Sequence, residues 1–66
     1  MTAVDQAPDS TATLGAFASE LRLRVQEATA ALEAAEAQGD PLLAQIAAGD
    51  LADLHALALR NDVDLP

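Results

Sequence analysis

Residues 38–41 read Gln38-Gly39-Asp40-Pro41, a combination that ends one helix and begins another. Glycine adopts the left-handed conformation that closes a helix, aspartate caps the next helix with its side chain, and proline fits the first helical position. Because the turn is confined to residues 39–40, the second helix must run antiparallel to the first. The stretch therefore predicts an antiparallel hairpin, with one helix over residues 10–38 and a second over residues 41–60.

The segment before this turn has apolar residues in alternating steps of four and three, from Leu14 to Ala35. On a helix this spacing gathers them on one face, in an arc roughly 100° wide. Glu20 and Arg24 are separated by one helical turn with the acid first, which is the favourable order for an ion pair along a helix. The large members of the expected apolar face are Leu14, Phe17, Leu21, Val25 and Leu32.

The segment after the turn carries a wider apolar stripe, in an arc of roughly 140° that one facing helix cannot cover. Gly49-Asp50 interrupts the stripe and allows two interpretations. The helix breaks there and Asp50 caps a third helix, or it continues and accepts a glycine cost of about 1 kcal/mol. Because the stripe keeps its phase across Gly49, we expect one continuous helix. The large members of this stripe are Leu43, Ile46, Leu51, Leu54 and Leu57.

A continuous second helix places Asp50 near the centre of its apolar stripe. Reflection of the hairpin about its turn then sets Gly49 and Asp50 opposite the small residues from Ala28 to Ala31. We expect a close approach of the two backbones there, with the Thr29 hydroxyl available to the Asp50 carboxylate.

The composition supports an all-α fold and limits how the chain can be stabilised. The apolar fraction of 52% argues against disorder, and it comes mainly from 17 alanines and 11 leucines, which favour helices. Cysteine is absent and His55 is the only histidine, so neither a disulfide nor a thiolate metal site can hold the fold. A chain of 66 residues buries a small core, and self-association is a common remedy.

The charge balance narrows the possible partners and the compartment. Eleven acidic residues against three arginines give a net charge of -8, which repels nucleic acid and anionic lipid surfaces. No apolar run approaches the roughly 20 residues of a membrane span, and residues 1–9 lack the features of a signal peptide. We expect a cytoplasmic protein that binds no nucleic acid and no membrane.

The two ends of the chain have no helical periodicity. Residues 1–9 are expected to form a disordered tail. Residues 61–66 form an acidic C-terminal tail that contains the apolar Val63 and Leu65. We expect this end to fray or to fold locally against its own helix, rather than to dock elsewhere.

The residues that carry chemistry are too few for catalysis. Cysteine and lysine nucleophiles are missing, His55 is the only imidazole base, and no glycine-rich phosphate loop is present. A metal held by His55 with Asp50 or Asp53 is disfavoured, because neither acid lies four residues from the histidine. We therefore expect no enzyme activity, no cofactor, no metal and no small-molecule substrate.

The apolar stripe of the second helix is wider than the first helix can cover, and this predicts a partner. The simplest is a second copy, which would join the apolar faces of two hairpins into one four-helix bundle. The expected function is a small non-catalytic interaction or oligomerisation module, structural or regulatory. The alternative is an inhibitory or accessory subunit, similar to antitoxins or anti-factors, that masks a larger basic protein. A possible second contact surface comprises Leu23, Leu42 and Leu59.

Overall fold

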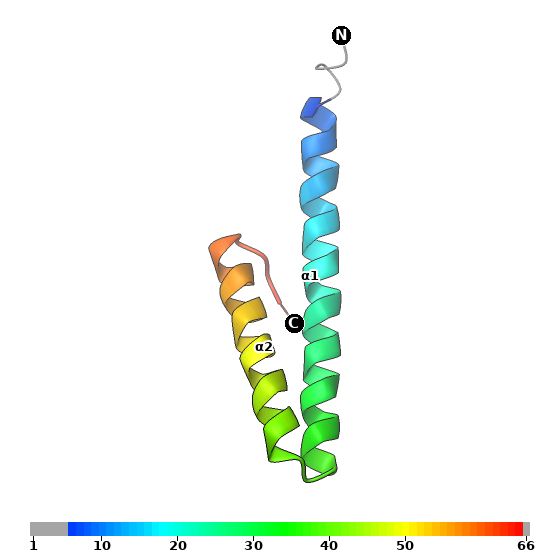
Figure 1. Cartoon of the computed structure of the whole chain (residues 1–66). Coiled ribbons are helices and arrows are strands. Elements are labelled where there is room, and N and C mark those ends of the chain that lie inside the picture. Colours follow the sequence, from blue (N-terminus) through cyan, green and yellow to red (C-terminus); the bar gives the residue numbers. More distant parts are fainter. Residues whose placement is uncertain (1–5, 66) are drawn as a thin grey trace.

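A computed structural model describes the backbone of residues 6–65 and the side chains of residues 14–65. Two helices, α1 (Gln6–Ala37) and α2 (Pro41–Arg60), form an antiparallel hairpin (Figure 1). The predicted all-helical hairpin is confirmed for the described residues, and α2 runs through Gly49 without a break. Helix α1 begins at Gln6, so residues 6–9 belong to it rather than to the expected tail, of which residues 1–5 lie outside the described part.

The turn between the helices has the hydrogen bonds that its sequence predicts. Gly39 adopts a φ of 68°, and its N–H donates to Glu36 O at 3.1 Å. The N–H of Asp40 donates to Ala35 O at 2.9 Å, which completes a Schellman motif at the end of α1. The Asp40 carboxylate then accepts a hydrogen bond from the N–H of Leu43 at 3.0 Å and caps α2. A single aspartate thus takes part in the end of one helix and the start of the next.

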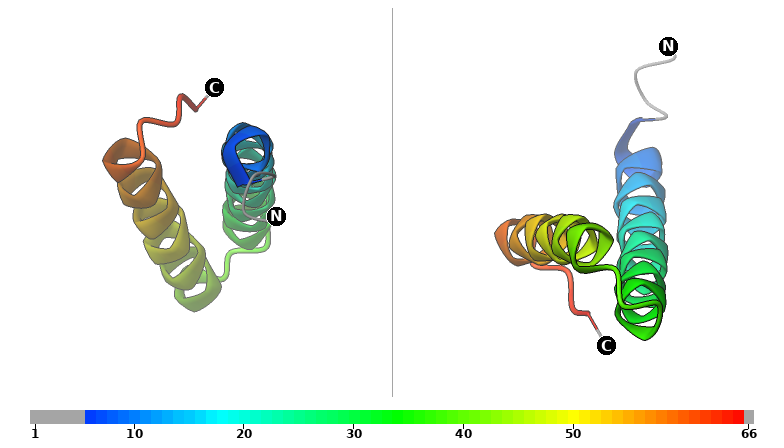
Figure 2. Two further views of the ribbon diagram at one scale, coloured as in Figure 1. Left: turned by 90° about the horizontal axis from the view of Figure 1, so that it is seen from above. Right: turned by 60° about the horizontal axis from the view of Figure 1, so that its bottom comes forward.

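The core between the helices is built mainly from small side chains. Alanine lets the helices approach closely near the turn, but it buries little apolar area. From the turn the helices diverge toward the C-terminal end of α2 (Figures 1 and 2). The buried residues among those described are Leu21, Val25, Ala28, Ala35, Ala47 and Ala58.

Helix α1 extends well beyond α2, since it contains 32 residues against 20 (Figure 1). Leu14 lies in this extension and is 68% exposed, although it belongs to the same seam as the buried Leu21. The apolar seam of α1 therefore continues past the point where its own partner helix ends.

The chain does not stop at the end of α2 but turns back toward α1. Asp62 has a φ of 55°, and the N–H of Val63 donates to Ala58 O at 2.9 Å, so a second Schellman motif ends α2. Residues 61–65, which we call the strap, then enter the space where the helices diverge (Figure 1). The Nε of Arg22 donates a hydrogen bond to Asp64 O at 2.9 Å. The C-terminal tail thus reaches α1, beyond the local fold on its own helix that the sequence predicts.

Candidate interaction surface

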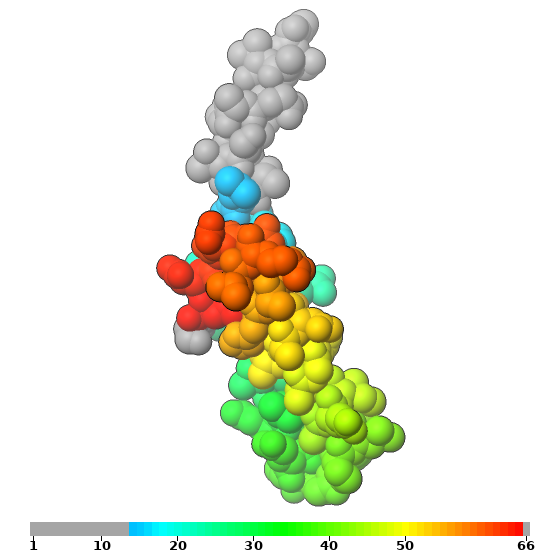
Figure 3. All heavy atoms as spheres, turned by 90° about the vertical axis from the view of Figure 1, so that its left-hand side faces the viewer, coloured from blue at the N-terminus to red at the C-terminus, as the bar shows by residue number. Residues whose placement is uncertain are grey.

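The two faces of the hairpin differ because the strap occupies only one of them. Figure 2 shows the strap on one side of the helix pair, and in Figure 3 it lies along one margin of α2. On the other side the helices border an open trough, apolar at its two ends, which we call the groove. Arg22 binds the strap whereas Arg24 lines the groove. Two positions on a helix are separated by roughly 200°, so strap and groove lie on different faces of α1.

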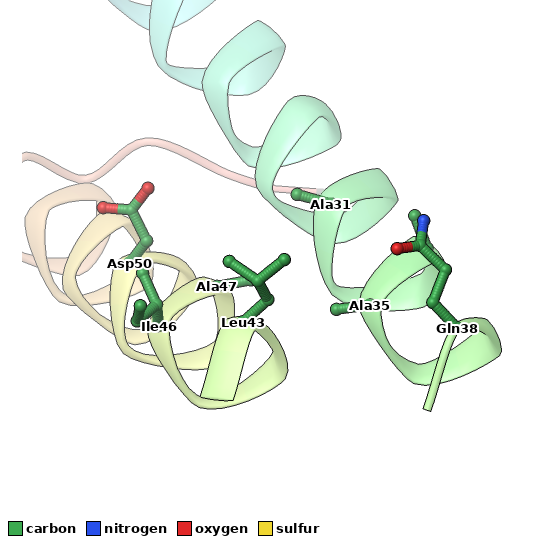
Figure 4. A pocket seen from close by; sticks show the side chains of 8 residues that line it. Ala31, Ala35, Gln38, Leu43, Ile46, Ala47 and Asp50 are labelled. Atoms are coloured by element: carbon green, nitrogen blue, oxygen red, sulfur yellow. The ribbon is translucent and has the colours of Figure 1, made fainter. Parts of the chain in front are cut away.

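At the turn end of the groove, large side chains of α2 border a strip of alanines on α1. Leu43 and Ile46 line a hollow of about 370 Å³ together with Ala31 and Ala35 (Figure 4). Leu43 is 50% exposed and Ile46 is 60% exposed, so the helix pair leaves both unburied. Big side chains therefore stand along one wall of the groove, and small side chains along the other.

The middle of the groove carries its charges. Arg24, Glu27 and Asp50 line a hollow of about 210 Å³ there. Arg24 makes the predicted ion pair with Glu20, with 3.1 Å between Nε and Oε2. Asp50 also lines the hollow at the turn end, so its carboxylate lies at the junction of the two hollows.

Two expectations about the surroundings of Asp50 are wrong. The Thr29 hydroxyl donates to Val25 O at 2.8 Å, which ties it to its own helix rather than to Asp50. Gly49 is exposed, and a Cβ added there would meet nothing within 4 Å, so the backbones make no close approach at this glycine. Gly49 lies two positions along α2 from the buried Ala47, roughly 200° around the helix, so it faces away from α1.

At the outer end of the groove, larger side chains from both helices lie next to one another. Phe17, Leu21, Leu54 and Leu57 line a hollow of about 320 Å³ there, with Glu20 and Arg24 at its edge. Leu21 is buried, and the other three apolar residues are half-buried. Asp50 lines both the turn-end and the middle hollow, and Arg24 and Leu54 line both the middle and the outer hollow, so the three form one groove along the hairpin.

The residues that the sequence assigns to a core or interface fall into three classes. Two are buried, Leu21 and Val25, and five are half-buried, namely Phe17, Leu32, Leu51, Leu54 and Leu57. Leu14, Leu43 and Ile46 are exposed, as are Leu23, Leu42 and Leu59 of the possible second contact surface. The exposed members of the first set belong to the groove or to the free extension of α1.

The described residues offer no arrangement suited to metal binding. His55 is exposed, and no cluster of three or more His, Asp or Glu side chains is present within the described part of the chain. The groove itself is an open trough, whereas small-molecule sites enclose most of their ligand. Its shape suits the side of another helix better than a small ligand.

Helix α2 is long and apolar enough, by length and composition alone, to cross a membrane. Core helices of soluble proteins also pass this test, but they are mostly buried, and α2 is not. The sequence gives no uninterrupted apolar run because Asp50 and Asp53 lie within the helix. Helix α2 therefore has apolar surface that the rest of the described chain does not cover.

Comparisons of the chain with protein-family models, with curated proteins and with solved structures give no match.

Proposed function

We propose that this protein is a non-catalytic interaction module that dimerises through the groove and forms a four-helix bundle. The observation that carries the proposal is the exposure of Leu43 and Ile46 beside an alanine strip on the same face. Burial of a large aliphatic side chain is worth about 1.5–3 kcal/mol when complete, so two half-exposed residues per chain offer a substantial gain.

A second copy fits the groove because the groove is complementary to itself. A two-fold axis places the α2 wall of each copy against the α1 wall of the other. Leu43 and Ile46 of one chain then enter the hollow that Ala31 and Ala35 border in its partner. Arg24 and Asp50 line the middle of the groove, so both side chains also lie at the interface of the proposed dimer.

The free extension of α1 also favours a helical partner. Its apolar seam continues to Leu14, which has no part of α2 opposite it. A helix from a second hairpin would extend the layer over this seam, as the helices of a bundle cover one another. A single hairpin with a core of mostly alanine leaves this surface in water.

Sedimentation equilibrium at micromolar concentration tests the proposal. The expected mass is that of two chains of 6.8 kDa each. Ile46→Glu places a charge in the groove and should give a folded monomer. Ala52→Glu is the control, because it adds the same charge to α2 at an exposed position outside the groove. A folded monomer for the unaltered protein over the whole concentration range would refute the dimer.

A larger basic partner is the second candidate, favoured by the acidic side chains along the groove. Glu20, Glu27 and Asp50 line it, and the whole chain carries a charge of -8. In this case the protein would be an inhibitory or accessory subunit that covers a basic surface. The free chain should then be poorly helical and gain helix with the partner, and the affinity should fall as salt rises.

A lipid bilayer is a third possible partner for the apolar surface of α2. The variants described above also distinguish lipid binding from protein binding. A carboxylate at the centre of a membrane-spanning helix costs about 2.5–3.5 kcal/mol, and α2 has Asp50 and Asp53 near its middle. We therefore favour protein over lipid. Co-sedimentation with neutral vesicles that Ile46→Glu abolishes, with no dimer in solution, would reverse this choice.

A further inference from the structure

The strap covers the end of the hairpin where its two helices separate. Leu21 and Ala58 are each 2% exposed, the lowest values in the described chain, although α1 and α2 diverge toward this end (Figure 1). Val63 and Leu65 of the strap are half-buried in the same region. The strap therefore adds cover at this end of the hairpin, beside Leu54 and Leu57 of α2, which line a hollow together with Leu21.

Two hydrogen bonds hold residues 63–65 of the strap in place. The N–H of Val63 donates to Ala58 O at 2.9 Å, and the Nε of Arg22, next to Leu21, donates to Asp64 O at 2.9 Å. The strap thus bridges from the end of α2 to the middle of α1, across the face opposite the groove. Leu51, which lines no part of the groove, is half-buried, whereas Leu43 and Ile46 on the groove wall are exposed.

The attachment of the strap is weak compared with that of a helix. It is short, and among the described side chains one hydrogen bond, on exposed atoms, links it to α1. The strap also requires Asp62 at a φ of 55°, a conformation that non-glycine residues adopt at a cost. Such a segment can leave the hairpin without loss of either helix.

We infer that the strap is a built-in cap that masks a second apolar face of the hairpin and so confines association to the groove. With the strap seated, each chain offers one apolar face, and assembly closes at two copies. With the strap displaced, Leu51 and Ala58 become accessible, and a second copy can bind on that side. A chain with two such faces would assemble beyond the dimer.

The test uses full-length Ile46→Glu protein, in which the groove is blocked. Val63→Ser and Leu65→Ser are introduced together into this background, to remove the apolar contacts of the strap. We expect the self-association constant from sedimentation to rise at least tenfold, and a hydrophobic fluorescent dye to bind more strongly. Asp64→Ala is the control, since it keeps the backbone acceptor for Arg22 and should change neither measurement.

Arg22→Gln in the same background provides a second route, because it loosens the strap without removing an apolar side chain. It should also raise the self-association constant, by a smaller factor than the double substitution of Val63 and Leu65. Asp62→Gly should do the reverse, since glycine relieves the left-handed conformation and favours the seated strap. Unchanged association in both strap variants, or loss of helix by circular dichroism without association, overturns the inference. All strap variants carry Ile46→Glu, so their association does not depend on the groove. If the unaltered protein is a monomer, the groove dimer is refuted, but the strap variants still test the role of the strap.

Discussion

The Asp40 carboxylate accepts a hydrogen bond from the N–H of Leu43 at 3.0 Å, and through it the turn specifies where α2 starts. The N–H of Asp40 bonds to Ala35 O in the Schellman motif of α1, and its own carbonyl accepts from the N–H of Ala44 at 3.0 Å. All the polar groups of this residue except one carboxylate oxygen thus have assigned partners. A hairpin with a small core depends on such local bonds for its direction.

Asp40→Ala should lower the free energy of unfolding by about 1 kcal/mol, because the N–H of Leu43 loses its acceptor. Urea denaturation followed by circular dichroism measures this change. Asp40→Asn keeps a side-chain oxygen and should cost much less. Equal losses for alanine and asparagine would show that the charge of Asp40 matters more than its capping bond.

Gly39→Ala and Gly49→Ala should change stability in opposite directions. Gly39 has a φ of 68°, where a Cβ is strained, so alanine there should cost about 1 kcal/mol. Gly49 is inside α2, and a Cβ there would meet nothing within 4 Å, so alanine should add about 1 kcal/mol. Thermal unfolding of the two variants side by side measures both effects. A destabilising Gly49→Ala would contradict the continuous, open helix described here.

The turn and the two helices could be predicted from the sequence, because each is specified by residues that are close together in the chain. Gln38-Gly39-Asp40-Pro41 contains a helix end, a cap and a helix start in consecutive residues. The continuity of α2 followed from the unbroken phase of its stripe. The contacts between the helices were harder, because periodicity gives the direction of a side chain but not the angle between two helices. Gly49 faces away from α1, because it lies roughly 200° around α2 from the buried Ala47, and the Thr29 hydroxyl bonds to its own helix.

The strap is the feature that sequence reasoning missed. Its docking on α1 depends on Arg22, a residue far away in the chain with no signal of its own. A local signal was nevertheless present. Asp62 follows Asn61 at the end of α2 and precedes the apolar Val63. Asparagine and aspartate tolerate the left-handed conformation, and an apolar residue just after it is typical of a Schellman motif.

Asp50→Ala should increase both the stability of the helix and self-association. Alanine has the higher helix propensity, worth a few tenths of a kcal/mol at an exposed position. It also removes a carboxylate that the proposed dimer would have to desolvate in the groove. Sedimentation should show a lower dissociation constant than for the unaltered protein. Weaker association would instead show that Asp50 pairs with a cation across the interface, for which Arg24 of the second copy is the candidate.

Leu21→Ala and Leu14→Ala separate the core of the hairpin from the surface left for a partner. Leu21 is 2% exposed, and its truncation should cost about 2–4 kcal/mol, which is most of the stability expected for a domain of this size. Leu14 lies on the same seam but in the free extension of α1, so its truncation should cost the single hairpin less than about 0.5 kcal/mol.

The comparison is best made by denaturation of both variants in the Ile46→Glu background, where the groove is blocked and only the single chain contributes. In the unaltered background Leu14→Ala should instead weaken self-association, because the second copy covers this part of the seam in the proposed bundle. A large loss of stability for Leu14→Ala in the single chain would show that the extension of α1 is already covered within one hairpin. In that case the seam beyond α2 would no longer argue for a helical partner.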